Sequence, residues 1–134
     1  MANPRNPVSD VMSRGAISVG EEVTLRSLAA VLAELDIGAV LVEQPDGSIA
    51  VVSERDIVRA LADDADPEEV WAADIASADI VFADPDETIL AIAERMSDEG
   101  VRHLAVVDRG RAVGVVSARD VLPILTSYLR ATLS

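Results

Sequence analysis

The sequence predicts a mixed α/β (α+β) fold built from two tandem copies of one β-α-β-β-α unit. Three observations predict it. Similar residues recur at a constant spacing, apolar residues in each copy follow the spacing of a buried helix face, and two β-rich runs follow that helix in both copies. We expect the two copies to pack with pseudo-two-fold symmetry.

The repeat is clearest in two phrases, VVSERDIV at 51–58 and VVSARDVL at 115–122. Aligning Ser53 with Ser117 gives an offset of 117 − 53 = 64 residues, and this offset matches similar residues over nearly the whole chain without a gap. A constant offset with matched chemistry indicates an internal duplication. The predicted organisation is repeat 1 at 7–62, an acidic linker at 63–71 and repeat 2 at 72–128.

Each copy begins with a short leader and a short extended piece, and a helix follows. Thr24 and Thr88 are the predicted N-caps of these helices. The apolar residues after them keep the i, i+3, i+4, i+7 spacing: Leu25, Leu28, Ala29 and Leu32 in the first copy, Ile89, Ile92, Ala93 and Met96 in the second. Gly100 is the predicted end of the second helix, and Asp36 has the equivalent place in the first.

Two β-rich runs joined by a turn follow each helix, AVLVE and SIAVV in the first copy and HLAVV and AVGVV in the second. A further helix is predicted to begin after Ser53 and after Ser117. Pro123 falls inside the second of these helices, and we expect it to kink or shorten that helix because proline lacks the backbone N–H.

Composition excludes several classes of function. The chain has no cysteine and one histidine, His103, so we expect no disulfide, no metal site and no Ser-His-Asp catalytic set. A net charge of −13 disfavours nucleic-acid binding. No apolar run is long enough to span a membrane and the first residues do not resemble a signal peptide, so we expect a cytoplasmic protein. All eleven basic residues are arginines, which suit a local phosphate-binding pocket.

The Ser-x-x-Asp phrase at each junction between a strand and a helix has a simple structural interpretation. Ser53 with Asp56, and Ser117 with Asp120, have the spacing of a helix capping box. Capping alone would explain these four residues.

A second interpretation is ligand binding. A helix N-terminus offers free N–H groups, and a carboxylate one turn into the helix can accept the hydroxyls of a ribose. Arg55 and Arg119 hold equivalent positions beside the two carboxylates, and a cap does not require them. Their presence in both copies favours the binding of a phosphorylated ligand.

The composite pattern, with the phrase IGAVLVEQPDGSIAVVSERDIV and the pairing of two copies, resembles a tandem of CBS domains (a Bateman module) over roughly residues 7–126. The resemblance implies that the chain binds adenosine nucleotides or related adenosyl ligands. In this family the aspartate holds the ribose hydroxyls, the serine lies by the sugar-phosphate, basic residues contact the phosphates, and the adenine lies against the early extended piece.

Carried over residue by residue, the second copy matches better. Its implied ligand-binding residues are Gly114, Ser117, Arg119 and Asp120, with Arg102 and His103 as the basic pair and Val81 as an apolar wall. Arg102 and His103 also stand where a β-run begins, and a polar surface position there is the competing interpretation.

The first copy keeps Ser53, Arg55 and Asp56, with Ile17 as the apolar wall. Ala50 replaces the glycine, which is expected to narrow the approach to the sugar, and Gly38 and Ala39 replace the basic pair. We therefore expect the pocket of the first copy to be weak, empty or selective for an uncharged adenosine moiety.

The leading hypothesis is a stand-alone regulatory module that binds an adenine nucleotide, requires no cofactor, forms a homodimer and passes its state to an unidentified protein. The resemblance leaves open whether Mg²⁺ accompanies the ligand. The alternative is a ligand-free interaction scaffold with vestigial pockets. An enzyme is disfavoured, because the sequence shows no nucleophile–base pair, no phosphate-binding loop of the GxxxxGK[ST] type and no metal-ligand cluster.

Overall fold

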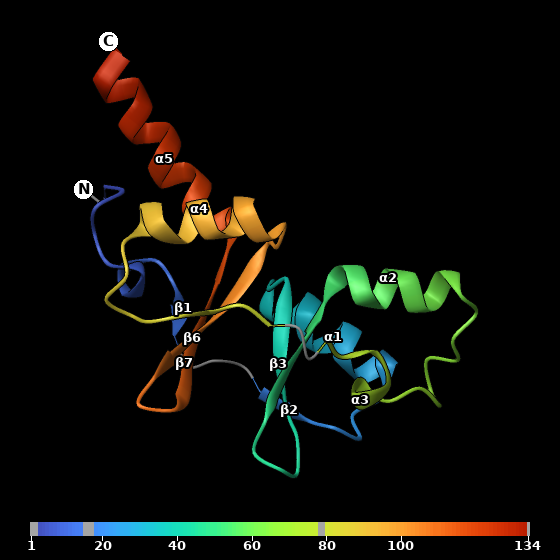
Figure 1. The fold of residues 1–134 in the computed structure, drawn as a ribbon. Coiled ribbons are helices and arrows are strands. Elements are labelled where there is room, and N and C mark those ends of the chain that lie inside the picture. The colour runs from blue at the N-terminus through green and yellow to red at the C-terminus, as the bar shows by residue number, and fades with distance from the viewer. Residues whose placement is uncertain (1–2, 15–17, 78–79, 134) are drawn as a thin grey trace. The chain divides into compact units, whose positions relative to one another are not determined.

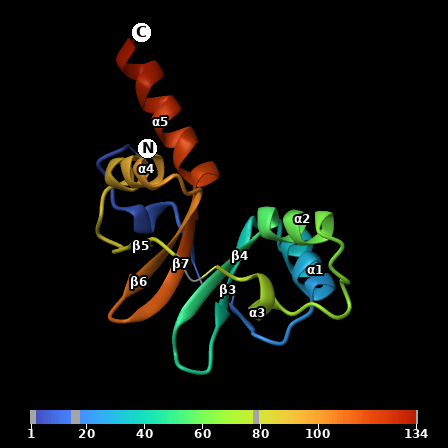
Figure 2. The ribbon, with the colours of Figure 1, turned by 45° about the vertical axis from the view of Figure 1, so that its right-hand side comes forward.

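The computed structural model describes residues 3–14, 18–77 and 80–133, and the chain divides into two compact units. Unit 1 combines Met1–Ala16 with Val81–Ser134, and unit 2 is Ile17–Ile80. Each unit has its own sheet, its own helices and its own core (Figures 1 and 2).

Unit 2 has a three-stranded sheet in the order β2-β3-β4, with β2 parallel and β4 antiparallel to β3. Its elements are β2 (Ser18–Gly20), α1 (Leu25–Leu35), β3 (Ala39–Glu43), β4 (Ile49–Ser53), α2 (Glu54–Ala62) and α3 (Ala72–Ile75). The succession β2-α1-β3-β4-α2 confirms the predicted unit for the first copy.

Unit 1 has a four-stranded sheet in the order β1-β7-β6-β5. Its elements are the 3-10 helix η1 (Val8–Asp10), β1 (Ser13–Arg14), β5 (Phe82–Ala83), α4 (Ile89–Glu99), β6 (His103–Asp108), β7 (Arg111–Ser117) and α5 (Ala118–Leu133). The succession β5-α4-β6-β7-α5 repeats that of unit 2, so the mixed α/β fold of two β-α-β-β-α units is confirmed.

The predicted ends of the first helix in each copy are also confirmed. The side-chain oxygens of Thr24 and Thr88 each accept the backbone N–H three residues on, at 3.2 and 3.1 Å. Gly100 ends α4 in the left-handed conformation with φ of 67°, and Asp36 ends α1 with φ of 52°. Glycine adopts this conformation without strain, and aspartate tolerates it better than most residues. Both positions can therefore end a helix.

Helix α5 is longer than the sequence predicted. Of the two effects expected of Pro123, shortening does not occur, because the helix is continuous over 16 residues. Proline removes the single N–H that would reach the carbonyl of Arg119, and the turns after it keep their own bonds. The hydroxyl of Thr126 additionally donates to the carbonyl of Leu122 at 2.8 Å. Over the described parts of the chain, no helix is long and apolar enough to cross a membrane.

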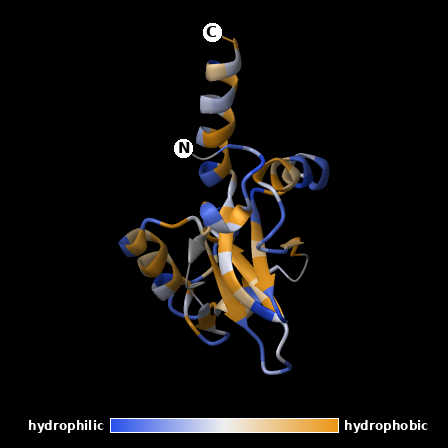
Figure 3. Cartoon of the chain, turned by 90° about the vertical axis from the view of Figure 1, so that its left-hand side faces the viewer, coloured by the Kyte–Doolittle hydropathy of each residue, from blue (hydrophilic) through white to orange (hydrophobic). Residues whose placement is uncertain are grey.

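The two cores are aliphatic, as the composition predicted, and Figure 3 shows the strands mostly in hydrophobic colours. No charged or polar side chain is among the buried residues that the structure describes. The buried set in unit 1 is Val8, Ala83, Ile89, Ile92, Met96, Leu104, Val106, Val116 and Val121. The buried set in unit 2 is Leu25, Leu28, Leu32, Val40, Val42, Ala50, Val52, Ile57 and Ala72.

The leader of each repeat lies in the unit that the other repeat builds. In unit 1, β1 pairs antiparallel with β7, with Ser13 opposite Val115. In unit 2, Ser77 forms an antiparallel bridge to Val51, which is the same contact shifted by the offset of 64 residues. The repeats of the sequence and the compact units of the structure therefore divide the chain at different points.

The residues just before each exchanged leader also close the N-termini of α1 and α4. The first two N–H groups of each helix have no partner inside the helix, and here they donate to carbonyls of residues 67–70 and 4–6. The bonds run from Leu25 to Val70 (2.8 Å) and Arg26 to Pro67 (3.0 Å) in unit 2, and from Ile89 to Asn6 and Leu90 to Pro4 (both 2.9 Å) in unit 1.

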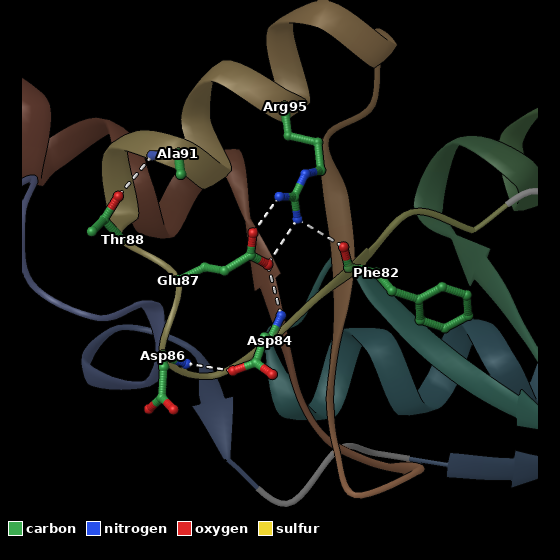
Figure 4. A network of polar contacts seen from close by, with 7 residues as sticks. All are labelled: Phe82, Asp84, Asp86, Glu87, Thr88, Ala91 and Arg95. Carbon is green, nitrogen blue, oxygen red and sulfur yellow. Dashed lines mark hydrogen bonds and ion pairs between the residues drawn. The ribbon is translucent and has the colours of Figure 1, made fainter.

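A polar network ties the end of β5 to α4 (Figure 4). The guanidinium of Arg95 donates to both carboxylate oxygens of Glu87 and, at 2.9 Å, to the carbonyl of Phe82. Glu87 also accepts the N–H of Asp84 at 2.8 Å. The bond from Arg95 is the main cause that holds the pKa of Glu87 below its ordinary value.

We expect Glu87→Gln to lower the free energy of unfolding at neutral pH by about 1 kcal/mol or less, because the pair is partly exposed. The folded state lowers the pKa of Glu87, so the charged pair stabilises the fold above the ordinary value of 4.5 and this stabilisation is lost as the pH falls through the lower folded value. Urea unfolding at neutral and acidic pH measures the difference. Glu94→Gln, an exposed change on the same helix, is the control, and an equal loss at both pH values would contradict the prediction.

Candidate functional site

Four predicted site residues lie at one edge of the unit 1 sheet: Val81, Arg102, His103 and Ser117. Strands β5 and β6 are parallel and begin at this edge, and the antiparallel β7 ends there. His103 lies opposite Ser117, and the N–H of Ala118 donates to the carbonyl of Arg102 at 2.8 Å. Val81 precedes β5, and its carbonyl accepts the N–H of Ala105 at 3.2 Å. The junction of β7 and α5 thus lies beside the basic pair.

Gly114 does not join this group. It is a buried residue within β7, between Val106 on β6 and Arg14 on β1. Successive residues of a strand face opposite sides, so position 114 faces the side of the buried Val116 and not that of Ser117. Its counterpart Ala50 is part of the unit 2 core, so its methyl group packs inside that unit.

The Ser-x-x-Asp phrases form capping boxes in both units, which confirms the simpler interpretation. In unit 1 the N–H of Ser117 donates to Oδ2 of Asp120 at 2.9 Å, and the N–H of Asp120 donates to Oγ of Ser117 at 3.2 Å. In unit 2 the corresponding bonds between Ser53 and Asp56 measure 2.8 and 3.3 Å. Each box fixes the rotamer of its carboxylate at the start of a helix.

The capping bonds leave one carboxylate oxygen of each aspartate without a hydrogen bond in the described parts of the chain. Only Oδ2 of Asp56 and of Asp120 is engaged by the described residues, so one carboxylate oxygen in each unit remains an acceptor. The hydroxyl of Ser53 also donates to Asp56 at 3.0 Å, whereas no described residue accepts the hydroxyl proton of Ser117. Unit 1 therefore keeps both a donor and an acceptor at this point.

The N-termini of α2 and α5 each retain one open backbone donor. The first N–H of α2 donates to the carbonyl of Gly38 at 3.0 Å, as that of α5 donates to Arg102, and the third N–H goes to the capping serine. The second N–H, of Arg55 and of Arg119, finds no partner among the described residues. These helices keep an open donor at their positive end for an anion, unlike α1 and α4, whose first and second N–H groups are both occupied.

The residues around the two boxes differ in charge. The equivalent positions hold Arg102, His103, Ala118 and Arg119 in unit 1, and Gly38, Ala39, Glu54 and Arg55 in unit 2. The side chains of Arg102 and Arg119 are exposed. Unit 1 thus surrounds its box with two permanent positive charges, whereas unit 2 has one, opposed by Glu54. A negatively charged ligand is favoured at unit 1.

Of the two residues predicted as apolar walls of the pockets, the structure describes one. Val81 is half-buried and packs against the unit 1 core, so it is a core residue at the edge of the site. Ile17 lies outside the described residues. Within the described ranges, no group of three or more His, Cys, Asp or Glu side chains is arranged to hold a metal ion.

Sequence reasoning did not find two features of the site. It did not show that Oδ2 of each aspartate is used by the cap while Oδ1 is left, because that depends on a rotamer. It also did not place the leaders in the opposite units, because the offset between the repeats does not say which unit a leader packs on.

Comparison with known proteins gives one family. The family model described as CBS domain matches residues 8–63 and 72–127. A similar relative is the uncharacterized protein MJ1225 of Methanocaldococcus jannaschii, 31% identical over 95% of this chain. Hypoxic response protein 1 of Mycobacterium tuberculosis is 32% identical over 84% of this chain and 80% of its own length. The chain spans 45% of the length of MJ1225 and 65% of a second archaeal relative from Methanopyrus kandleri.

Among solved structures, the chain resembles the CBS domain protein PAE2072 from Pyrobaculum aerophilum complexed with AMP. The TM-score is 0.80 and the sequence identity is 31%, over 96% of this chain and 99% of the other.

Asp120→Ala is expected to lower the free energy of unfolding by about 1 kcal/mol, because it removes the capping carboxylate. Asp120→Asn is expected to cost much less, because its side-chain carbonyl can still accept the N–H of Ser117. Urea unfolding of both variants measures the difference. Asp56→Ala is the matched control in the other unit and should lose a similar amount; no loss in either alanine variant would contradict the capping assignment.

Proposed function

The chain belongs to the CBS domain family, and from this premise we propose that it is a regulatory module that binds an adenosine-containing ligand at the Ser117–Asp120 edge of unit 1. The observation that carries the proposal is the uneven chemistry of two otherwise equivalent sites. Unit 1 combines an unused carboxylate oxygen, an unused hydroxyl and two exposed arginines, whereas unit 2 lacks the basic pair.

The proposed roles follow from these groups. Oδ1 of Asp120 accepts a ribose hydroxyl, while Oδ2 stays in the cap and keeps the carboxylate oriented. The hydroxyl of Ser117 and the open N–H of Arg119 face the sugar-phosphate. The side chains of Arg102, His103 and Arg119 bind phosphate oxygens, for which a guanidinium has the matching geometry. Val81 gives an apolar surface to the base.

For unit 2 we propose a weaker site that prefers an uncharged adenosine moiety. Ser53, Arg55 and Asp56 keep the same local geometry, but the hydroxyl of Ser53 is already used and Glu54 opposes the single arginine. Ile17 and Gly114 keep the roles that the resemblance implies as predictions only.

The relative from Pyrobaculum aerophilum supports the class of ligand, since it was solved with AMP and is 31% identical over nearly its whole length. We propose that the chain acts without a cofactor and without turnover, as a homodimer that passes its state to a protein partner. Its cytoplasmic location and any contribution of Mg²⁺ stay predictions.

A ligand-free scaffold is the second candidate. It is favoured by the two capping boxes, which give Ser53, Asp56, Ser117 and Asp120 a structural role without any ligand. The two candidates differ in what a neutral substitution of the aspartate does, because the scaffold has no binding to lose.

We expect one of AMP, ADP, ATP or S-adenosylmethionine to raise the melting temperature, since a ligand that binds only the folded state stabilises it by about 2.7 kcal/mol at 100 times its Kd. Asp120→Asn should abolish the shift while leaving the melting temperature of the free protein nearly unchanged, and Asp56→Asn should retain it. A thermal-shift titration measures all three proteins. If none of the ligands produces a shift, the ligand-free scaffold is the better interpretation. Release of phosphate from ATP above a buffer blank would contradict binding without turnover.

The sequence of unit 2 indicates a substitution that tests phosphate recognition in unit 1. Arg102→Gly with His103→Ala gives unit 1 the residues that unit 2 has at the same positions. We expect this double variant to weaken AMP binding by about tenfold or more, because charged hydrogen bonds are lost, and to leave adenosine binding nearly unchanged. Isothermal titration with both ligands measures this, and an equal loss for AMP and adenosine would show that the pair does not bind phosphate.

A further inference from the structure

The two units carry very different charge. Unit 2 has fifteen Asp and Glu residues against three arginines, whereas unit 1 has nine against eight. Nearly all of the net charge of −13 therefore belongs to unit 2. Both units form the same β-α-β-β-α fold, so the fold does not require this excess of acid. A strongly negative surface attracts cationic partners and speeds their association.

Many of the acidic residues of unit 2 lie on two segments that run side by side. Residues 66–74 lead from the end of the linker into α3, and residues 20–26 lead from β2 into α1 (Figure 1). Backbone hydrogen bonds join the two segments, among them the bond from the N–H of Ala72 to the carbonyl of Val23 at 2.7 Å. We call the six carboxylates of these segments the acidic surface: Glu21, Glu22, Asp66, Glu68, Glu69 and Asp74.

Most carboxylates of the acidic surface have no cation beside them. The two segments hold one arginine, Arg26, and it pairs with Glu68. Among the described residues, no other carboxylate of the acidic surface forms an ion pair. Like charges close in space repel one another, and a cationic partner would relieve that repulsion. Solubility is the competing explanation for such a surface, but it accounts only for the charge.

An exposed tryptophan lies between these carboxylates. Trp71 is 44% exposed and is the one tryptophan of the chain. Its backbone forms an antiparallel bridge to Thr24, and its N–H donates to the carboxylate of Asp74 at 2.8 Å. The residue before it, Val70, packs against the unit 2 core. Trp71 has an extended backbone, in which successive side chains face opposite sides, so its indole faces away from that core.

The fold does not need an indole at this position. In unit 1 the equivalent residue is Pro7, which makes the same antiparallel bridge, to Thr88, between the same pair of flanking hydrogen bonds. Glu69 likewise stands where unit 1 has Arg5. Tryptophan gains more than most residues from burial and is enriched in the hot spots of protein interfaces. An exposed tryptophan that the fold can replace therefore indicates an interaction surface.

We propose that the acidic surface and Trp71 form a docking site for a basic segment of another protein. An arginine or lysine of that segment stacks on the indole, where the ring quadrupole attracts a cation, and its neighbours pair with the carboxylates. The proposal goes beyond the proposed function and does not depend on it, because no residue of the docking site belongs to either Ser-x-x-Asp phrase. A nucleic acid is not the occupant, since the acidic surface repels phosphates.

The first test uses Trp71 as its own reporter, because no other tryptophan contributes to the emission. The probe is a short peptide of alternating glycine and arginine, and the control peptide has glutamine in place of arginine. We expect the arginine peptide to change the emission of Trp71 saturably and to bind more weakly as salt rises, because salt screens exposed charges. No saturable change, or an equal change with both peptides, would overturn the proposal.

The second test compares variants of the chain by isothermal titration with the arginine peptide. Glu69→Arg gives unit 2 the residue that unit 1 has at the same place, and we expect it to weaken binding by about tenfold or more, because it turns an attraction into a repulsion. Trp71→Leu keeps an apolar side chain and the backbone bond to Asp74. It should weaken binding by about threefold or more, because the cation loses the aromatic face.

Glu34→Arg is the matched control for charge. It makes the same change of net charge at an exposed position near the other end of α1, and it should bind the arginine peptide nearly as well as the unchanged chain. Equal losses in Glu34→Arg and Glu69→Arg would show that net charge alone matters, and would overturn the proposal, as would unchanged binding by Trp71→Leu. Circular dichroism checks that each variant is folded, and the melting temperature shift with AMP reports separately on the nucleotide site.

Discussion

The exchange of leader segments between the two repeats is the constraint on which the rest of the structure depends. Backbone carbonyls of the residues just before each leader accept the first two N–H groups of α1 and of α4, and these groups would otherwise be unpaired. That closure occupies the positive ends of α1 and α4 with protein. Open backbone donors remain at the N-termini of α2 and α5, where the two Ser-x-x-Asp phrases lie.

Duplication gave the two units the same backbone contacts but different side-chain chemistry. Where unit 1 joins Glu87 to Arg95 by an ion pair, the equivalent residues Val23 and Val31 pack against the unit 2 core. The same divergence separates the two candidate pockets, since the cap persists in both while the basic pair exists in one. A structural cap is retained by the need to fold, so a recognition function can be lost from one copy without loss of the fold.

Periodicity and caps predicted most of the fold, because they depend on residues near in sequence. Thr24 and Thr88 begin helices and Gly100 ends one through bonds within four residues, and the β-rich runs pair through short turns. The exchange of leaders joins Ser13 to Val115, about 100 residues apart, and no local signal specifies that pairing. In the site, the resemblance indicated the aspartates, but which oxygen the cap uses and which face Gly114 takes depend on packing.

The division of the chain into units has a consequence for synthesis on the ribosome. Unit 2 is one continuous stretch, Ile17–Ile80, and all its strands are available once that stretch has emerged. The first residues of the chain belong to unit 1, and their partner β7 ends only at Ser117. Domains fold as units during synthesis, from the N-terminus onward. The residues that precede unit 2 therefore gain their strand partner only after β7 has been made, whereas unit 2 has all its strands once Ile80 has emerged.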